Sequence, residues 1–305
     1  MPPVRVAVAP RSGRHESLIA AVSQGGGQVV DVAEAEALVW ADAARADLLP
    51  GVLADGPGVR WVQLPFAGIE NYVHLLDRDR VWTCGKGVYA RPVAEHALGL
   101  ALAGMRHLAA YARERSWSRP SGHNLLGARV TIVGGGEITR ELVTLMRPFG
   151  ADVTVVRRSD EPFEGASRTV GTAGLLDALA SADLVVLTLA LTDQTVGIID
   201  ATALGAMQDH AWLVNVARGR HVDTDALVAA LGSGGIGGAA LDVTDPEPLP
   251  DDHPLWSAPN CLITPHVGNT PEMGIPLLAA RVRDNVERFA VGQPLLGLVD
   301  VDLGY

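Results

Sequence analysis

Short apolar runs alternate with amphipathic segments over the first ninety residues. The apolar runs are rich in β-branched residues and are bounded by polar or glycine-containing segments, which predicts strands. Residues 15–26 (HESLIAAVSQGG) have a helical pattern that ends on glycines. Such alternation predicts a parallel sheet covered by helices on both faces. The strand candidates are residues 4–9, 28–32, 37–41 and 59–64.

A second alternating series begins near residue 130. Helical patterns, for example residues 138–149 and 224–232, lie between its apolar runs. The series predicts a complete doubly wound domain of about 175 residues. Its strand candidates are residues 130–133, 153–156, 184–189, 212–217, 237–241 and 261–264. Residues 115–124 and 245–254 are rich in Ser, Pro, Asp and Gly and are expected to be loops.

Two long helical segments join these series. Apolar residues occur all round segment 92–115, so we expect one long helix buried against a second domain, a second subunit or both. Segment 271–291 is expected to return to the first domain, where residues 296–303 (LGLVDVDL) add an edge segment. The pattern therefore predicts two doubly wound parallel-sheet domains, with the second inserted into the first.

Composition narrows the class of protein. Of the 305 residues, 48% are hydrophobic and 19% are charged, as in a globular protein, and the net charge is −11. The acidic balance disfavours binding to nucleic acid or anionic membrane, so local positive groups must attract any anionic substrate. No apolar run approaches the ~20 residues of a membrane span. The N-terminal stretch MPPVRVAVAPRSGR is a poor signal peptide.

The cysteines and histidines do not indicate a metal site. Cys84 and Cys261 form no Cys-x-x-Cys pair, which favours two free thiols in a reducing cytoplasm. No His-Glu-x-x-His or paired-cysteine spacing occurs, so no metal is expected.

A glycine-rich turn lies between the strand candidate 130–133 and the following helix. Gly134 and Gly136 would permit a tight turn, and the N–H groups at Glu137 and Ile138 would face an anion. This context predicts a dinucleotide site that holds a pyrophosphate. Thr139 replaces the third glycine of the usual pattern, which lets helix and strand pack closely, and Glu137 places an acidic side chain close to the expected phosphate. We therefore expect a looser pyrophosphate site.

The end of the next strand bears on the choice of cofactor. An NAD site normally has an acidic residue about twenty positions after the glycines, which accepts hydrogen bonds from the ribose hydroxyls. Here the chain has Arg157 and Arg158, followed by Ser159. Two guanidinium groups suit a 2′-phosphate, so NADP(H) is the expected cofactor, with NAD(H) possible. The alternative is a solvated arginine pair on a loop.

Three segments place reactive side chains at the C-terminal ends of neighbouring strands, where ligands bind in open α/β sheets. They are WLVNVARGR with Arg218, AALDVTDPEP with Asp242 and Glu247, and CLITPHVGN with His266. A cation, a carboxylate and a histidine form an acid–base unit suited to carbonyl reduction. No serine or cysteine nucleophile accompanies them, which argues against hydrolysis.

These motifs together resemble the D-isomer-specific 2-hydroxyacid dehydrogenase family, along nearly the whole chain. The matching stretches are the glycine turn and residues 215–231, 238–256 and 259–268. The resemblance implies a Rossmann cofactor domain (93–271) inserted into a flavodoxin-like substrate domain (1–92 and 272–305). It also implies reduction of a small 2-oxo acid to a D-2-hydroxy acid by hydride transfer from NAD(P)H.

The resemblance also implies residue roles. Arg218, Glu247 and His266 correspond to the family's catalytic residues, and Asp242 corresponds to its nicotinamide-amide acceptor. Residues 64–71 (LPFAGIEN) look like its substrate loop, whose backbone N–H groups, here at Ala67, Gly68 and Ile69, hold the substrate carboxylate. Phe66 stands where the family usually has a small residue. Glu95, His96, Arg220 and His253 are interpreted as structural or solvated residues.

Two alternative functions stay open at this point. One is a formate-dehydrogenase-like enzyme, although that branch has glutamine where this chain has Glu247. The other is a non-enzymatic, dinucleotide-sensing interaction protein of the same fold. We also expect a homodimer, because helix 92–115 leaves no wide polar face for solvent and because two-fold dimers are implied by the resemblance.

Overall fold

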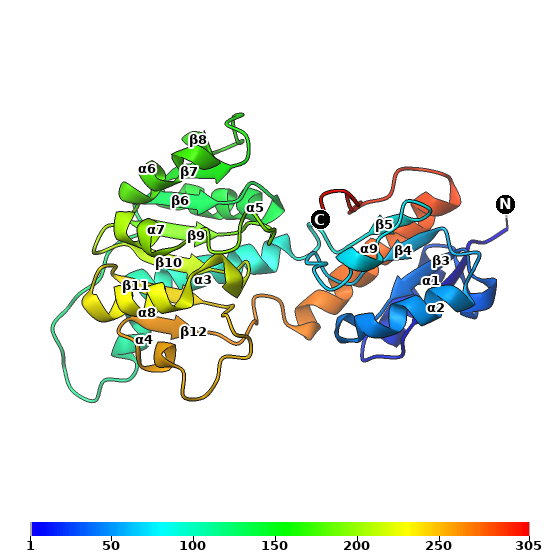
Figure 1. Ribbon diagram of the computed structural model, residues 1–305, viewed down its shortest axis with the longest axis horizontal. Coiled ribbons are helices and arrows are strands. Elements are labelled where there is room, and N and C mark those ends of the chain that lie inside the picture. Colours follow the sequence, from blue (N-terminus) through cyan, green and yellow to red (C-terminus); the bar gives the residue numbers. More distant parts are fainter. Residues whose placement is uncertain (1, 305) are drawn as a thin grey trace. The chain divides into compact units, whose positions relative to one another are not determined.

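The computed structural model describes residues 2–304 and divides the chain into two compact units. Unit 1 comprises Met1–Tyr89 and Thr270–Tyr305, and unit 2 comprises Ala90–Asn269 (Figure 1). The domain boundaries expected after residues 92 and 271 fall in the first turns of helices α3 (Ala90–Met105) and α9 (Pro271–Ala290). Each of these helices lies wholly within one unit.

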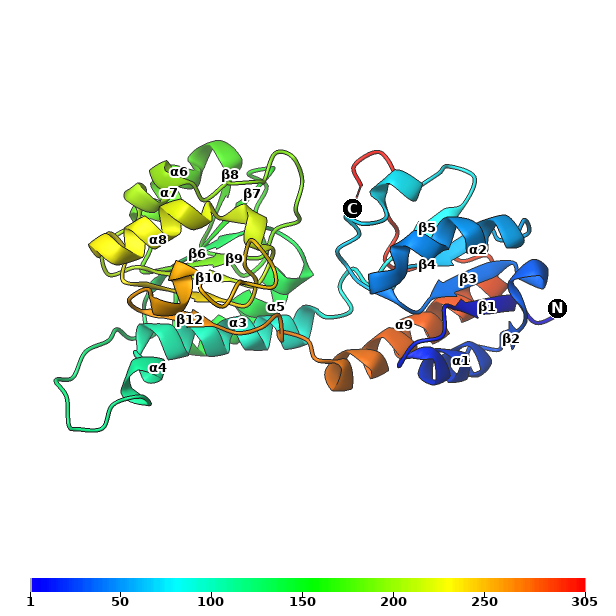
Figure 2. The same ribbon diagram turned by 60° about the horizontal axis from the view of Figure 1, so that its bottom comes forward.

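Unit 1 contains a five-stranded parallel sheet in the order β2-β1-β3-β4-β5, which is the flavodoxin-like order. Helices α1 and α9 pack together on one face, and α2 covers the other (Figure 2). Its core includes the buried indoles of Trp40 and Trp82. The strands are β1 (Arg5–Ala9), β2 (Gln28–Val29), β3 (Ala37–Trp40), β4 (Trp61–Gln63) and β5 (Val81–Thr83), and the first two helices are α1 (His15–Gln24) and α2 (Leu49–Asp55).

A buried polar network attaches α9 to the sheet of unit 1. The side-chain amide of Asn285 donates to Gln63 Oε1 over 2.9 Å, and Thr83 Oγ1 donates to the same oxygen over 2.9 Å. Asn285 Oδ1 accepts from the backbone N–H of Leu296 over 2.8 Å. Because an unpaired polar group would be costly here, this network specifies how the returning C-terminal segment pairs with the N-terminal sheet.

Unit 2 contains a seven-stranded parallel sheet in the order β12-β11-β10-β9-β6-β7-β8, the Rossmann order with one added strand. Its central strands are apolar and fully buried, as expected for a sheet covered on both faces. The strands are β6 (Arg129–Val133), β7 (Asp152–Arg157), β8 (Arg168–Gly171), β9 (Leu184–Leu187), β10 (Trp212–Asn215), β11 (Gly238–Leu241) and β12 (Cys261–Ile263).

Helices cover both faces of this sheet (Figure 2). Helices α3 and α5 lie on one face, and α6, α7 and α8 lie on the other. The remaining bounds are α4 (Leu108–Tyr111), α5 (Glu137–Met146), α6 (Leu175–Ala180), α7 (Ala201–Ala206) and α8 (Thr224–Ser233). The predicted class of two doubly wound parallel-sheet domains is therefore confirmed.

The prediction of one continuous helix over residues 92–115 is wrong. Helix α3 ends at Met105, His107 has a left-handed backbone with φ of 52°, and only the short α4 follows. The carbonyl of Met105 accepts a hydrogen bond from the backbone N–H of His123 over 2.7 Å. The returning loop thus terminates the helix, a long-range effect that the local pattern does not contain.

The distribution of burial on α3 also differs from the expectation of an all-round buried helix. Small side chains such as Ala94, Ala97 and Ala101 pack inside unit 2, and Gly104 lies directly against the Trp212 ring. Leu98 and Leu102 are only partly buried, and Gly99 is exposed. One face of α3 therefore belongs to the core of unit 2 and the opposite face is only partly covered.

The prediction also missed two edge strands, β5 and β8, and extended others too far. Each missed strand has at most four residues, and Arg168 makes β8 partly polar, so neither forms an apolar run. Residues 28–32 form only the two-residue β2. The predicted edge segment 296–303 makes a single antiparallel bridge, between Thr83 and Leu298.

Candidate active site

The candidate catalytic residues lie beyond the C-terminal ends of three adjacent strands of unit 2. Strands β10, β11 and β12 are neighbours in the sheet, and Arg218, Glu247 and His266 follow them in that order. The hydrogen bond between His266 and Glu247 is the largest cause of the lowered pKa of Glu247 and the raised pKa of His266; the charge of Arg218 acts on both groups, adding to the first shift and opposing the second. The structure therefore brings together three side chains that are 48 positions apart at most in the sequence.

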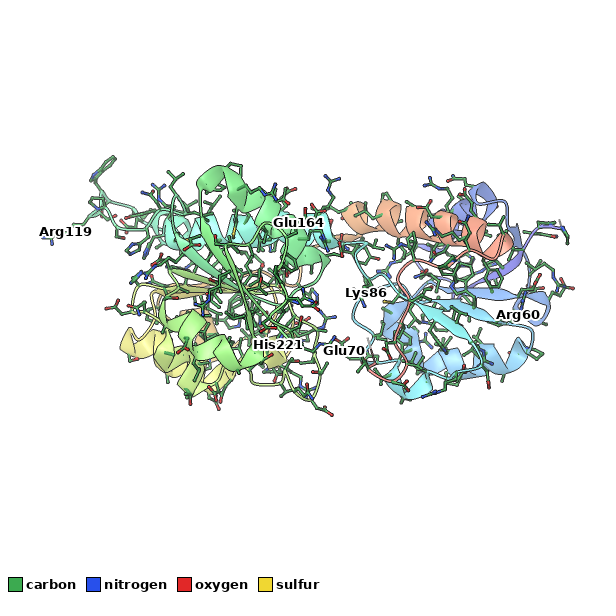
Figure 3. All side chains as sticks on the ribbon, turned by 90° about the horizontal axis from the view of Figure 1, so that it is seen from above. Arg60, Glu70, Lys86, Arg119, Glu164 and His221 are labelled. Carbon is green, nitrogen blue, oxygen red and sulfur yellow. The ribbon has the colours of Figure 1, made fainter. Side chains whose placement is uncertain are left out.

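The backbone of Arg218 is held on both sides. Its carbonyl accepts from the side-chain amide of Asn215 over 2.9 Å, and its N–H donates to Nδ1 of His221 over 3.2 Å. Nε2 of His221 lies 3.3 Å from the carbonyl oxygen of Ala190, so the proton of the neutral ring belongs on Nε2. His221 is completely buried in unit 2 (Figure 3).

Gly219 allows the chain to pass close to the neighbouring loop. A side chain there would place its Cβ 1.9 Å from the carbonyl oxygen of Thr244. Only glycine permits this approach, which keeps the Arg218 turn against the loop that carries Glu247.

His266 and Glu247 form a direct pair. Nδ1 of His266 lies 2.6 Å from Oε1 of Glu247, a short charge-assisted hydrogen bond. This bond raises the pKa of His266 and lowers the pKa of Glu247. Nε2 of His266 has no partner among residues 2–304, and the side chain is 51% exposed. The imidazole is therefore fixed through one nitrogen and can transfer a proton through the other.

Asp242 lies beneath the loop that carries His266. Its carboxylate accepts from Thr264 Oγ1 over 2.6 Å and from the backbone N–H groups of Val267 and Gly268 over 2.9 Å each, and His96 Nε2 lies 3.2 Å away. Burial alone would raise the pKa of Asp242, but these hydrogen bonds outweigh it and lower the pKa to about 2. The ionised carboxylate thus fixes the His266 loop, in which His266 has a left-handed φ of 52°.

The glycine turn has the features of an anion site. Gly134 has a φ of +127°, and a side chain there would collide with Thr188. The first-turn N–H groups of α5, at Gly136, Glu137 and Ile138, donate no hydrogen bond to any described residue. Free N–H groups at a helix N-terminus suit a pyrophosphate, so the local structure fits a dinucleotide.

Thr139 is accommodated in the turn through its hydroxyl group. The side chain is fully buried, and its Oγ1 lies 3.0 Å from the carbonyl oxygen of Gly134 and 2.9 Å from Oγ1 of Thr188. Thr188 in turn lies 3.2 Å from the carbonyl oxygen of Val133. Hydrogen bonds therefore join α5, the turn and the end of β9, where a third glycine would only allow close packing.

Arg157 ends β7 and lies against the glycine turn. Its Cβ and Cδ would each be 3.1 Å from a side chain at Gly135, and it forms no ion pair with any described carboxylate. Arg158 follows it and is exposed. Glu137 pairs with Arg140 across one turn of α5, with 3.4 Å between Oε2 and Nε. A positive charge thus offsets the acidic side chain nearest to the expected phosphate position.

The substrate-loop candidate lies in unit 1, after β4. Within residues 2–304, the backbone N–H groups of Ala67, Gly68 and Ile69 donate no hydrogen bonds. Gly85 N–H donates to the carbonyl of Phe66 over 2.9 Å, which holds the start of the loop. The loop therefore presents consecutive unpaired donors, an arrangement that suits a carboxylate.

The sequence analysis missed several residues that hold the site. From the sequence, His96 is interpreted as structural, and the structure places its Nε2 3.2 Å from Asp242 Oδ1 and 3.1 Å from Thr264 Oγ1. His221 and Thr188 are not singled out from the sequence. A partial indication existed, since His221 lies three positions after Arg218 and Thr188 is the second-last residue of the predicted strand 184–189. Apart from Arg218, the partners of these residues lie 31 to 168 positions away in the chain, so only the fold reveals those contacts.

Three further observations concern the described part of the chain. Among the described residues, no cluster of three His, Cys, Asp or Glu side chains could hold a metal ion. Cys84 and Cys261 are free thiols. None of the helices found in residues 2–304 has the length and apolar character needed to cross a membrane.

The chain is similar to several known proteins. The family model for the D-isomer specific 2-hydroxyacid dehydrogenase NAD binding domain matches residues 98–268. An uncharacterized protein in the proB 3′ region of Corynebacterium melassecola is 40% identical over 296 residues, 93% of this chain and 95% of that protein. Glyoxylate/hydroxypyruvate reductase A of Serratia proteamaculans is 30% identical over 289 residues, 88% of this chain and 87% of the reductase.

A solved structure agrees with these relationships. The D-isomer specific 2-hydroxyacid dehydrogenase of Xanthobacter autotrophicus Py2, in complex with NADPH and MES, has a TM-score of 0.85 and 28% sequence identity, with 100% of both chains covered. The fold and the matched motifs define an NAD(P)-dependent dehydrogenase. The chain belongs to the D-isomer-specific 2-hydroxyacid dehydrogenase family.

Proposed function

We propose that this dehydrogenase reduces a small 2-oxo acid to the D-2-hydroxy acid, with NADPH as the preferred reductant. The observation that carries the proposal is the 2.6 Å pair of His266 and Glu247 beside Arg218. A fixed imidazole with a raised pKa, next to a guanidinium, can protonate a carbonyl oxygen as it gains negative charge.

Each of the three residues has a separate task. Arg218 binds the substrate carboxylate and polarises the keto group. His266 donates the proton on Nε2 to the forming alkoxide. Glu247 accepts from Nδ1, which orients the ring and stabilises its protonated form. The free N–H groups of Ala67, Gly68 and Ile69 bind the substrate carboxylate.

The residues of the glycine turn hold the cofactor in this proposal. The N–H groups at Gly136, Glu137 and Ile138 would hold the pyrophosphate, Gly134 would allow its close approach, and Asp242 would accept from the nicotinamide amide. A bound nicotinamide supplies the hydride. Arg157 and Arg158 bind a 2′-phosphate, because Arg157 lies at the turn without a carboxylate partner among the described residues.

We also propose a homodimer in the cytoplasm. Outside the core of unit 2, Leu108 is 53% exposed, Leu126 is 66% exposed and Trp117 is 102% exposed. Trp117 lies in the loop 112–124 that extends from α4, and Figure 3 shows Arg119 at the tip of this loop. A second subunit would cover these groups and the partly covered face of α3. Free thiols suit a reducing compartment.

The experiment is a turnover assay of a panel of 2-oxo acids with NADH and with NADPH. Oxidation of the dinucleotide with at least one 2-oxo acid, and a product of D configuration, is the expected result. Dinucleotide binding without turnover on any 2-oxo acid would instead favour the sensing protein. Light scattering should give twice the mass of one chain at micromolar concentration, and the single-chain mass would contradict the dimer.

A further inference from the structure

An arginine from a distant loop reaches the substrate-loop candidate of unit 1. Arg14 lies between β1 and α1, and the carbon of its guanidinium is 4.6 Å from the centroid of the Phe66 ring. This is a cation–π distance. Since β1 and β4 are parallel strands of one sheet, the loops that follow them emerge at the same edge. The substrate loop itself contains neither arginine nor lysine.

Both partners of this contact are held in position. Ser12 Oγ donates to the carbonyl of Ala41 over 3.0 Å and accepts from the Arg14 N–H over 3.3 Å, which ties the loop to the end of β3. The Phe66 ring packs against Tyr89 with 5.8 Å between centroids, and the Tyr89 hydroxyl donates to the carbonyl of Pro65 over 2.6 Å. The guanidinium therefore occupies a defined place on the substrate loop.

The charge of Arg14 has no counter-charge in the part of the chain that the structure describes. Its Nη1 is buried without a hydrogen-bond partner, and the adjacent His15 has a buried Nδ1 in the same condition. Arg14 forms no ion pair with any residue in 2–304. Buried nitrogens are normally hydrogen-bonded in native proteins. A ligand that accepts a hydrogen bond from Nη1 of Arg14 would directly explain why this atom has no partner in the structure.

The neighbouring side chains cannot supply the missing negative charge. Burial raises the pKa of Tyr72 and of Tyr89 to about 12, so both phenols stay neutral. Asp42, whose charge also acts on Tyr72, accepts a hydrogen bond from the backbone N–H of Ala44 and forms no ion pair with Arg14. The chain has a net charge of −11, so an anionic ligand must be attracted by local positive groups. An arginine without a counter-charge at this edge of the sheet is such a group.

We propose that Arg14 is a specificity-determining residue that binds a second anionic group of the substrate, a carboxylate or a phosphate. This inference rests on the proposed function, in which the N–H groups of Ala67, Gly68 and Ile69 bind the carboxylate next to the keto group. The Phe66 ring, which contacts Arg14, belongs to the same loop. The substrate class is then a 2-oxo acid with a second acidic group at its far end.

The test uses substrates that form matched pairs. Oxaloacetate carries a terminal carboxylate where 4-methyl-2-oxopentanoate has an isopropyl group of similar shape. Phosphohydroxypyruvate and hydroxypyruvate form the second pair, which separates a phosphate from a carboxylate. For the wild type, kcat/KM with NADPH should be higher for the anionic member of at least one pair.

Three variants identify the contribution of Arg14. Arg14→Gln should lower kcat/KM for the preferred anionic substrate by about 10- to 100-fold, mainly through KM, because a charged hydrogen bond is lost. The neutral member should change by less than about twofold. Arg14→Lys should keep part of the preference, since it keeps the charge but not the planar stacking. Arg11→Gln, an exposed residue of the same loop, is the control and should behave as wild type.

Equal losses on all four substrates would overturn the inference, because Arg14 would then serve the shared carboxylate or only the loop. Absence of any anionic preference in the wild type would also overturn it. Titration calorimetry with oxaloacetate repeats the comparison without turnover. An inactive protein that binds oxaloacetate through Arg14 would contradict the proposed reaction and leave the Arg14 assignment intact. If the protein is active on 2-oxo acids and Arg14→Gln does not change kcat/KM, the proposed reaction is supported and the Arg14 assignment is contradicted.

Discussion

The C-terminal edges of the two sheets differ in how their polar groups are paired. In unit 2, Glu247 is bonded to His266, Asp242 accepts from three donors and lies beside His96, and the backbone of Arg218 is held from both sides. In unit 1, the N–H groups of Ala67, Gly68 and Ile69 and Nη1 of Arg14 have no partner among residues 2–304.

Under the proposed function, this difference separates the candidate catalytic groups from the groups that would bind an anion. A proton donor must hold one geometry before the substrate arrives, and mutual hydrogen bonds provide that order. A group that binds an anion must leave its donors available, at the cost of an unpaired polar atom while the site is empty. Arg157 follows the second pattern inside unit 2, since it too lacks a carboxylate partner in the described chain.

The largest expected effect comes from removing the proton donor. His266→Gln should lower turnover by about 10²–10⁴-fold, because glutamine can keep a hydrogen bond to Glu247 but cannot deliver a proton. Cofactor affinity should stay nearly unchanged, as measured by the quenching or enhancement of NADPH fluorescence. Turnover within about threefold of the wild type would remove His266 from the mechanism.

The second effect concerns the unpaired cation of unit 2. Arg157→Asp should reverse or abolish the preference for NADPH, because a bidentate contact to the 2′-phosphate is lost and repulsion replaces it. The expected loss is about 1.5–3 kcal/mol, or roughly 10- to 100-fold in NADPH affinity. Activity with saturating NADH should be spared. Similar kcat/KM values for NADH and NADPH in the wild type would show that the arginine pair is only solvated.

The third effect tests whether the buried pairing in unit 2 matters for function. His221→Leu leaves the N–H of Arg218 buried without an acceptor, which costs about 1–3 kcal/mol, and should lower kcat/KM for the 2-oxo acid about tenfold or more. His221→Asn restores an acceptor near the position of Nδ1 and should recover most of the loss. If both variants are equally impaired in thermal stability and in kcat/KM, His221 is a packing residue only.

The smallest loss of kcat/KM is expected for Glu247→Gln at acidic pH, and this loss should grow as the pH rises. The hydrogen bond to Glu247 raises the pKa of His266, and reduction requires protonated His266. Without the carboxylate the pKa of His266 falls, so the alkaline limb of the kcat/KM profile should move to lower pH. At acidic pH the imidazole is protonated in either protein, and the two should differ little. A profile identical to that of the wild type contradicts the pairing.

The sequence by itself determined the class of fold and the positions of the candidate catalytic residues. Buried parallel strands are apolar along their whole length, so the strands that lead to Arg218, Glu247 and His266 are visible as local runs. The glycine turn is equally local, because Gly134 and α5 are adjacent in the chain. The short edge strands β5 and β8 were missed because they bury too little to form such a run.

Only the tertiary structure decided which groups are paired and which are left unpaired. His96 is 146 positions from Asp242, Thr139 is 49 from Thr188, and Arg14 is 52 from Phe66, which its guanidinium contacts. Helix α3 ends at Met105 because a distant N–H, that of His123, reaches its last carbonyl. Such contacts depend on strand order and on the direction in which each loop leaves its sheet. Both arise from packing the whole chain, and local periodicity does not encode them.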